Sequence, residues 1–349
     1  MDLFKPDIFS QSTPNWIKAT PCLEKELAPI ISQIVPSSSL NELVIEFSGS
    51  MEINSSNFRL SFLNKRHILK KWPSTQAYAC LVNIVKTNLF LIDNKIPVPD
   101  VIPFKNGQTI LEWNTNLWTC SEFIDGEYFS GRNNQLKEAS FITAKTANAL
   151  YSLPEEIHPT RKINHKIDKI LALVKKTDLL NVNWEQIFGH DISLLLEKNW
   201  SKIKRTCIDL KQVEIDGGPV FPNHYDMHPH NLLFIENKPL FLLDFDSIVG
   251  IPIGYSIAYS ALKQCRQSIA YNQDFNALSQ IGKNYIDSLH ENLDIGDMKW
   301  INNFKALAQM ETLRRIGIVL ELNLDGNNAW NKVLYILISN LYEVEELFD

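Results

Sequence analysis

The densest group of chemically capable side chains lies between residues 223 and 246. Residues 223–231 read Asn-His-Tyr-Asp-Met-His-Pro-His-Asn, and Asp244-Phe245-Asp246 begins thirteen residues after Asn231. Carboxylate, imidazole and amide groups at this density can move protons and bind metal ions. Three kinds of chemistry fit these residue types.

The first is a metal site built from histidines. Four potential ligands alternate along the chain, a spacing that a zinc hydrolase could use: His224, Asp226, His228 and His230. Alternate side chains share one face only in an extended segment, and Pro229 with the lack of β-branched residues favours an irregular loop. No second histidine cluster supplies further ligands, so the pattern disfavours a histidine metal site.

The second is a phosphatase. Residues 242–247 could end a buried strand that carries a nucleophilic aspartate and a second acid two residues later. This string resembles the start of haloacid dehalogenase-like phosphatases. Their motif usually opens the domain and precedes a parallel α/β series, whereas here it lies past the middle and precedes helices. Its position therefore disfavours a phosphatase.

The third is phosphoryl transfer. An Asp on a loop can accept a proton from an acceptor hydroxyl, and an Asn five residues later can reach a metal ion. An Asp after the following hairpin can hold that metal against nucleotide phosphates. Oxygen ligands of this kind are those that Mg²⁺ prefers. A hairpin predicted at residues 232–235 and 240–243 would bring Asn231 and Asp244 together.

The elements that must position these residues change character along the chain. Apolar spacing predicts helices over residues 20–34, from an N-cap at Ser74 to about Asp93, over 134–211, and from 256 to the end. Short alternating runs predict strands near residues 43–47, 57–62, 67–72, 101–104, 109–113 and 117–123. The sequence therefore predicts an α+β chain with a small, antiparallel, β-rich N-lobe and a larger, mainly helical C-lobe.

Composition excludes several other classes of protein. The 349 residues carry a net charge of −6 without a concentrated basic stripe, which disfavours nucleic-acid binding. No apolar stretch approaches the ~18 residues of a membrane span, and the first thirty residues lack the pattern of a secretory signal. Five widely spaced cysteines fit reduced side chains, so we expect a cytoplasmic protein without membrane insertion.

The spacing His224-x-Asp226-x-x-x-x-Asn231, followed by Asp244, resembles the catalytic loop of a known superfamily. This is the aminoglycoside phosphotransferase and choline kinase superfamily, whose members have a bilobal, protein-kinase-like fold. The resemblance implies an ATP-dependent kinase that uses Mg²⁺. It makes Asp226 the catalytic base, Asn231 and Asp244 the metal ligands, and His224 a support for the loop.

Asp246 extends this resemblance. The Asp-x-Asp form made by Asp244 and Asp246 recurs in N-acetylhexosamine kinases and other small-molecule kinases, which implies Asp246 as a further metal-site residue. It also favours a hydroxylated small molecule as acceptor, either a sugar, an amino sugar or a related metabolite. Aminoglycoside-modifying and choline-type kinases are less favoured alternatives. His230 stands where the superfamily usually has glycine.

The N-terminal half resembles the lobe that covers the nucleotide. Ser48-Gly49-Ser50 lies where a phosphate-covering loop is expected, and Lys70, with Lys71 in reserve, matches the lysine that holds the α- and β-phosphates. The backbone of Glu122 and Ile124 would bind adenine at the hinge. The resemblance thus implies an N-lobe over residues 1–124, with its extra helix at 20–34, and a C-lobe over 125–349.

One departure opens a second function. Active members pair the lysine with a Glu on the following helix, yet residues 74–91 contain no Asp or Glu, and Asn83 or Gln76 lies nearest that position. An amide can orient a lysine but does not offset its charge. A nucleotide-binding regulator of the same fold therefore stays open. On the C-terminal helices, Glu311 and the pair Arg314-Arg315 could face an anionic or hydroxyl-bearing substrate, but solvated surface charges are favoured over that role.

Overall fold

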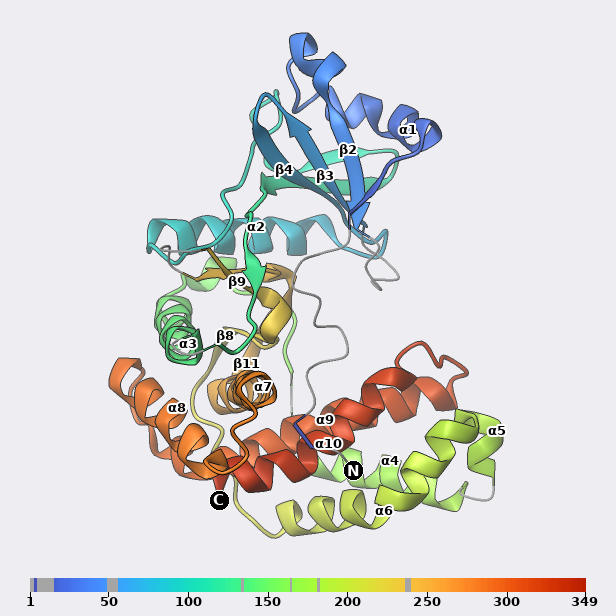
Figure 1. Cartoon of the computed structure of the whole chain (residues 1–349), viewed down its shortest axis with the longest axis vertical. Coiled ribbons are helices and arrows are strands. Elements are labelled where there is room, and N and C mark those ends of the chain that lie inside the picture. The colour runs from blue at the N-terminus through green and yellow to red at the C-terminus, as the bar shows by residue number, and fades with distance from the viewer. Residues whose placement is uncertain are drawn as a thin grey trace.

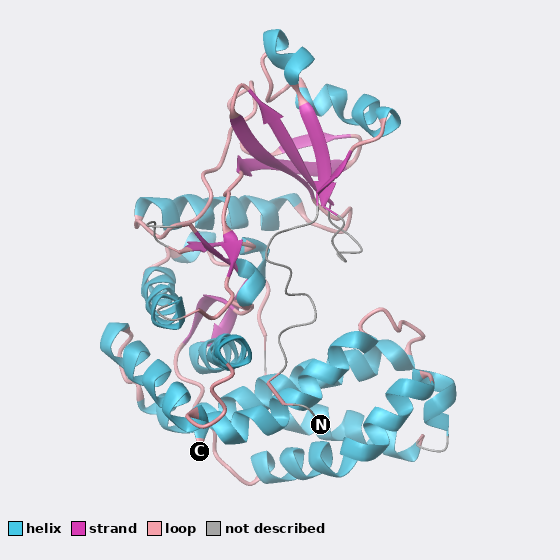
Figure 2. Ribbon diagram, viewed as in Figure 1, coloured by secondary structure: helices cyan, strands magenta, loops and turns pink. Residues whose placement is uncertain are grey.

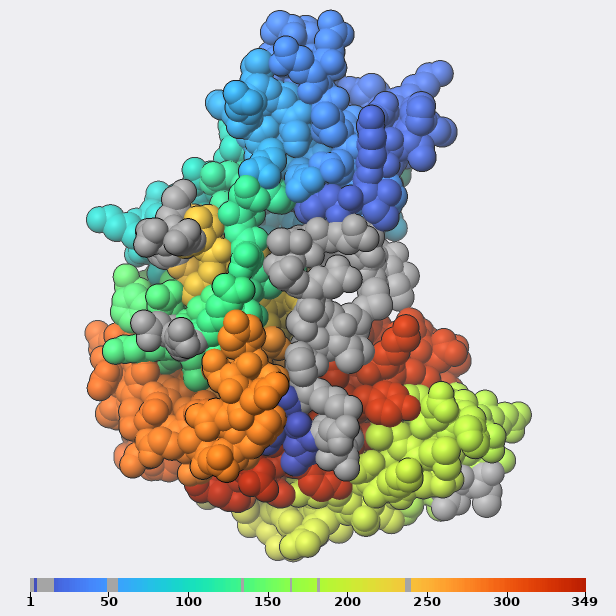
Figure 3. Space-filling model, in the orientation of Figure 1, coloured from blue at the N-terminus to red at the C-terminus, as the bar shows by residue number. Residues whose placement is uncertain are grey.

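The computed structural model shows two lobes, with a narrow sheet-containing N-lobe standing over a wider helical C-lobe (Figure 1). It describes residues 3–4, 16–48, 56–132, 135–163, 165–180, 183–235 and 240–349. The difference in width is clear in the space-filling view (Figure 3). The α+β bilobal architecture predicted from the sequence is confirmed.

The N-lobe is built on one antiparallel six-stranded sheet with the order β1-β2-β3-β4-β6-β5. Its strands are β1 (Trp16–Lys18), β2 (Val44–Ser48), β3 (Ser56–Phe62), β4 (Lys65–Lys71), β5 (Leu111–Trp113) and β6 (Asn116–Glu122). Alternation in β3 buries Phe58, Leu60 and Phe62 on one face. Helix α1 (Pro21–Ile31) completes this core with Leu27, Ile30 and Ile31.

Two predictions in this lobe need correction. Helix α2 (Tyr78–Asp93) starts after Ala77 and has no side-chain cap, so Ser74 does not cap it. The strand expected near residues 101–104 is reduced to a single bridge between Val101 and Ser121, and β1 was not predicted. The three-strand meander and the helix that follows it are confirmed.

Eight helices are described in the C-lobe, and its two smaller sheets lie toward the upper part of this lobe, below α2 (Figure 2). They are α3 (Gln135–Tyr151), α4 (Ile167–Leu179), α5 (Trp184–Phe188), α6 (His190–Lys211), α7 (Ile253–Asn272), α8 (Leu278–Asn292), α9 (Phe304–Leu324) and α10 (Asn331–Phe348). Helix α7 is buried from Ile253 to Ile269, because other elements cover it on every side. It is the central support of the lobe.

The small sheets carry the chemistry-bearing segment. Strand β8 (Val220–His224) pairs with β11 (Ile248–Pro252), and β9 (Leu232–Phe234) pairs with both β7 (Glu127–Tyr128) and β10 (Phe241–Leu242). The hairpin of β9 and β10 is confirmed; its turn lies outside the described residues. Residues 221–231 were expected to be irregular, but residues 220–224 form β8, which is buried from Phe221 onward. Strands β7 and β11 were also not predicted.

The N-terminal residues reach the C-lobe. Phe4 is buried in the large C-lobe core, and its backbone N–H donates to Glu343 Oε1 at 2.6 Å. Leu91, Ile96 and Val98 belong to the same core. The division at residue 124 therefore stays a proposal, with parts of the first 124 residues packed on the second lobe. Within the described ranges, no helix combines the length and apolar character needed to cross a bilayer.

Candidate active site

The loop between β8 and β9 is fastened by His224. Its Nε2 lies 2.9 Å from the carbonyl oxygen of Leu243, so Nε2 carries the proton, and its Nδ1 accepts the N–H of Asp226 at 3.3 Å. Burial lowers the pKa of His224 and keeps the ring neutral. The hydroxyl of Ser256 on α7 donates to the His224 carbonyl at 2.8 Å. His224 thus ties the loop to the hairpin and does not face a substrate.

Asn231 closes the other end of the loop. Its side-chain amide donates to the Asp226 carbonyl at 2.9 Å, and its own carbonyl accepts the N–H of Leu243 at 2.9 Å. Asp244 follows directly, with a φ of 66° in the left-handed region that non-glycine residues seldom adopt. The hairpin therefore brings Asn231 beside Asp244, as its spacing predicted.

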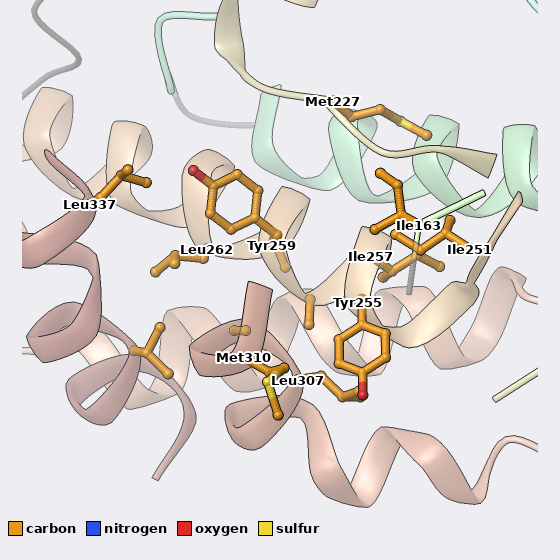
Figure 4. Close-up of a cluster of buried hydrophobic side chains, with 14 of the residues drawn as sticks. Ile163, Met227, Ile251, Tyr255, Ile257, Tyr259, Leu262, Leu307, Met310 and Leu337 are labelled. Carbon is orange, nitrogen blue, oxygen red and sulfur yellow. The ribbon is translucent and has the colours of Figure 1, made fainter. Parts of the chain in front are cut away.

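The C-lobe core packs against the loop that carries Asp226. Met227 is buried within a cluster that includes Ile251 and Ile257 (Figure 4). The Gln264 side chain of α7 donates to the Met227 carbonyl at 3.0 Å. Because Met227 is buried next to Asp226, the loop has an apolar anchor and the carboxylate is placed by packing.

Lys70 connects the two lobes. Its Nζ lies 3.3 Å from Asp244 Oδ1 and 3.1 Å from Asp246 Oδ2, and 4.4 Å from the ring centre of Trp72. Burial acts to raise the pKa of Asp246, but the charge of Lys70 and the hydrogen bonds with Asp244 and Lys70 together hold the pKa below its usual range. Both acidic partners come from the C-lobe. Asn83 on α2 instead donates its amide to the His158 carbonyl at 3.0 Å.

Asp226 pairs with a residue from α9. Its Oδ1 lies 3.0 Å from Arg315 Nη1, and its Oδ2 lies 3.6 Å from His228 Nε2. Burial acts to raise the pKa of Asp226, yet Arg315 and then His228 lower it, so the pKa falls below its usual range. About a quarter of the side chain is exposed (24%), so the ionised carboxylate stays accessible to a ligand.

Arg315 is itself held by a buried carboxylate. Glu311, only 1% exposed, accepts from Arg315 Nε at 2.7 Å and from two nitrogens of Arg314 at 2.7 Å each. His165 Nε2 lies 2.6 Å from the second Glu311 oxygen. The expectation of surface charges was wrong: one face of α9 carries an ionic network that ends on Asp226. Only the sequence Glu-x-x-Arg-Arg hinted at it, because i, i+3 and i, i+4 residues share a helix face.

The proposed nucleotide contacts in the N-lobe are only partly visible. Ser48 ends β2, whereas Gly49 and Ser50 lie outside the described residues. At the hinge, the Glu122 N–H donates to the Asp100 carbonyl at 2.8 Å, and the exposed Glu122 is followed two residues later by the buried Ile124. Adenine binding at this position stays a prediction.

The two alternative chemistries gain no support from the geometry. No group of three or more His, Cys, Asp or Glu side chains is placed to hold a metal ion among the residues described, which leaves the histidine metal site without a ligand set. The strand before Asp244 belongs to an antiparallel hairpin and not to a parallel α/β series. Neither a zinc hydrolase nor a dehalogenase-like phosphatase fits this arrangement.

Comparison with known proteins finds similarity at the level of structure. No family model matches the sequence, and no curated protein matches it. Amicoumacin kinase hAmiN, solved with AMP-PNP, Ca²⁺ and Ami, superposes with a TM-score of 0.63 at 12% identity, over 93% of this chain and 96% of that chain. Spectinomycin phosphotransferase APH(9)-Ia, solved with ADP and spectinomycin, gives 0.60 at 15% identity, over 87% and 92%.

This chain has the fold of the aminoglycoside phosphotransferases and choline kinases. Choline kinase from Cryptosporidium parvum Iowa II also matches, with a TM-score of 0.54 at 14% identity, over 93% of this chain and 96% of that chain. The fold expected from the catalytic-loop resemblance is therefore confirmed. Since these identities lie below 25%, the activity must be argued from the residues of this chain.

Proposed function

We propose that this protein is an ATP-dependent phosphotransferase that moves the γ-phosphoryl group to a hydroxyl of a sugar, amino sugar or related small metabolite. One observation carries the proposal: Lys70 of the N-lobe meets Asp244 and Asp246 of the C-lobe beside Asn231 and the loop that carries Asp226. Positively and negatively charged groups from opposite lobes converge there, as phosphoryl transfer between a nucleotide and an acceptor requires.

In this proposal Asp226 orients the acceptor hydroxyl. The hydroxyl oxygen forms a bond to the γ-phosphorus, the bond from that phosphorus to the β–γ bridging oxygen breaks, and ADP leaves. The hydroxyl proton passes to the Asp226 carboxylate. Because Arg315 holds Asp226 ionised, the carboxylate acts mainly by orientation and accepts the proton late in the transfer.

The donor set fits Mg²⁺. Asn231 provides an amide oxygen, while Asp244 and Asp246 provide carboxylates, and hard oxygen donors are the ligands this ion prefers. Asp246 Oδ1 is buried and has no hydrogen-bond partner among the described residues, which fits the role of a metal-ligand oxygen. When bound, Mg²⁺ would neutralise charge on the phosphates. Lys70 would then hold the remaining phosphate oxygens.

The second candidate is a nucleotide-binding regulator without transferase activity. It is favoured by α2, which contributes no carboxylate to Lys70. The kinase is supported more strongly, because Asp244 and Asp246 provide Lys70 with the carboxylate partners that α2 does not contribute.

The test is acceptor-dependent ADP formation. The protein is incubated with ATP, Mg²⁺ and a panel of sugars, amino sugars and amino alcohols, with Asp244→Asn as the matched control. ADP that depends on both acceptor and Asp244 supports the kinase. Binding of ATP without ADP from any acceptor favours the regulator. The proposal places the reaction in the cytoplasm, where the five unpaired cysteines stay reduced.

A further inference from the structure

Two arginines lie beside Tyr225, the residue before Asp226. The Arg161 and Arg315 guanidinium carbons lie 5.5 and 5.4 Å from the Tyr225 ring centre. Arg315 Nη2 also donates to the Tyr225 carbonyl at 3.1 Å. Burial and the charge of Asp226 raise the pKa of the Tyr225 phenol, and Arg161 and Arg315 act to lower it without reversing the shift. Two guanidinium groups therefore lie at the residue that precedes Asp226.

The carboxylates nearby do not balance these charges. Arg315 is shared between Asp226 and Glu311, and Arg314 uses the same Glu311. Arg161 is exposed and forms no ion pair with any residue that the structure describes. Three guanidinium groups thus face two carboxylates, in a protein whose overall charge is −6. Glu311 is 1% exposed while Arg314, Arg315 and Asp226 are 16%, 20% and 24% exposed, so the two arginines and Asp226 are the members of this network that reach solvent.

Backbone pairing fixes the position of Arg161. The Gly250 N–H donates to the Arg161 carbonyl, and the Ile163 N–H donates to the Gly250 carbonyl, each at 2.9 Å. Residues 161–163 therefore run beside β11, which pairs with the strand that leads into Asp226. The neighbouring Lys162 lies over Gly250, where its Cγ would be 3.1 Å from an added Cβ. Arg161 and Lys162 are both exposed, and of these two side chains Arg161 is the one that lies over the Tyr225 ring.

His165 and Lys166, which follow Arg161 and Lys162 in the sequence, line a cavity of about 500 Å³. Its lining residues include one basic side chain and no acidic one: His165, Lys166, Ile215, Gly217, Gly218, Pro252 and Tyr255. His165 connects this cavity to the Glu311 network, and its ring stacks on Tyr255 with centres 3.6 Å apart. The acidic neighbour is Asp216, whose carboxylate accepts the Gly218 N–H at 2.8 Å.

Building on the proposed function, we infer that the acceptor carries a negatively charged group, a carboxylate or a phosphate, which Arg161 binds while the acceptor hydroxyl lies on Asp226. Guanidinium groups suit such planar or tetrahedral anions, and an ammonium group would be repelled here. The structural neighbours named as choline, ethanolamine and aminopropanol kinases have amine-bearing substrates in their names. This chain would differ from them in the charge of its acceptor.

The test compares acceptors that share a skeleton and differ in charge. The hexose set is glucose, glucosamine and glucuronate, and the three-carbon set is glycerol, 2-amino-1,3-propanediol and glycerate. Glucose 6-phosphate and glycerol 3-phosphate distinguish a phosphate from a carboxylate. ADP formation with ATP and Mg²⁺ is measured for the native protein, for Arg161→Gln and for the matched control Lys162→Gln.

We expect the anionic member of at least one set to show the highest kcat/KM, by about tenfold over the neutral member, with the amine lowest. Arg161→Gln should raise KM for that anion by about tenfold with kcat little changed, and Lys162→Gln should leave both unchanged. Highest turnover of the amines, or equal effects of the two variants, would overturn the inference while the observed ADP upholds the proposed function.

If no acceptor yields ADP, the proposed function fails and binding decides the inference. Ligand-observed NMR with the same compounds then measures affinity without transfer. Binding of an anionic compound that weakens in Arg161→Gln but not in Lys162→Gln supports the inference. Preferential binding of the amines, or binding of none, overturns it.

Discussion

Replacing Arg315 with glutamine should raise the pKa of Asp226. In the native protein the guanidinium lies 3.0 Å from the carboxylate and opposes the effect of burial. Without this charge, the largest effect that opposes burial is lost, so the protonated acid is favoured at higher pH than before. The proposed reaction needs the ionised carboxylate, and the acidic limb of its pH profile should respond.

Coulomb's law gives the size of the expected pKa shift. Two unit charges 4 Å apart interact by about 4 kcal/mol at an effective dielectric constant of about 20, which corresponds to about 3 pKa units. Asp226 is 24% exposed, so solvent screens part of this interaction and a shift of about 1–2 units remains. Activity is lost as pH falls through the pKa of Asp226. The loss in Arg315→Gln should therefore begin about 1–2 pH units higher than in the native protein.

The assay is kcat/KM for acceptor-dependent ADP formation between about pH 3 and pH 7, with folding checked by circular dichroism at each pH. Arg314→Gln is the control, because it removes the same charge and two hydrogen bonds to Glu311 without contacting Asp226. An acidic limb that stays in place in Arg315→Gln, or that moves equally in both variants, would refute the argument that Arg315 sets the charge state of Asp226.

Three further substitutions test other parts of the account. Lys70→Met should raise KM for ATP by about tenfold, whereas Lys71→Met should leave it nearly unchanged; equal effects in steady-state kinetics would contradict the assignment. Glu311→Gln should lower the free energy of unfolding by about 3–5 kcal/mol, because two arginines lose their buried partner; a loss under 1 kcal/mol in urea titration would count against the network. His224→Ala should lower the free energy of unfolding by about 2–4 kcal/mol, because it removes two hydrogen bonds and leaves a cavity. An unchanged urea midpoint would exclude the role of His224 in holding the loop.

The arrangement around the hairpin was predictable because local rules govern it. A turn between two short apolar runs places Asn231 beside Asp244 whatever the rest of the chain does. The meander of β2, β3 and β4 and the place of Lys70 at the end of β4 follow equally from alternation. The residues that form these features lie close together in the sequence, so a local pattern can predict them.

The contacts of Arg315 were not predictable in this way. It lies 90 residues after Tyr225, and only the packing of α9 against α7 brings it to the loop. Strand β8 was missed because nearly all of it is buried, so its sequence shows no alternation and its polar residues Asn223 and His224 suggested a loop. A buried ion pair depends on tertiary placement, and the sequence of α9 alone equally fits a solvated surface.

The most direct test of the central claim is the activity of Asp226→Asn. The substitution keeps the size of the side chain and removes the carboxylate that orients the acceptor and accepts its proton. We predict a loss of acceptor-dependent ADP formation by about 100-fold or more, with the affinity for ATP, measured by calorimetry, unchanged. Turnover equal to that of the native protein would contradict the assignment of Asp226 and with it the proposed reaction.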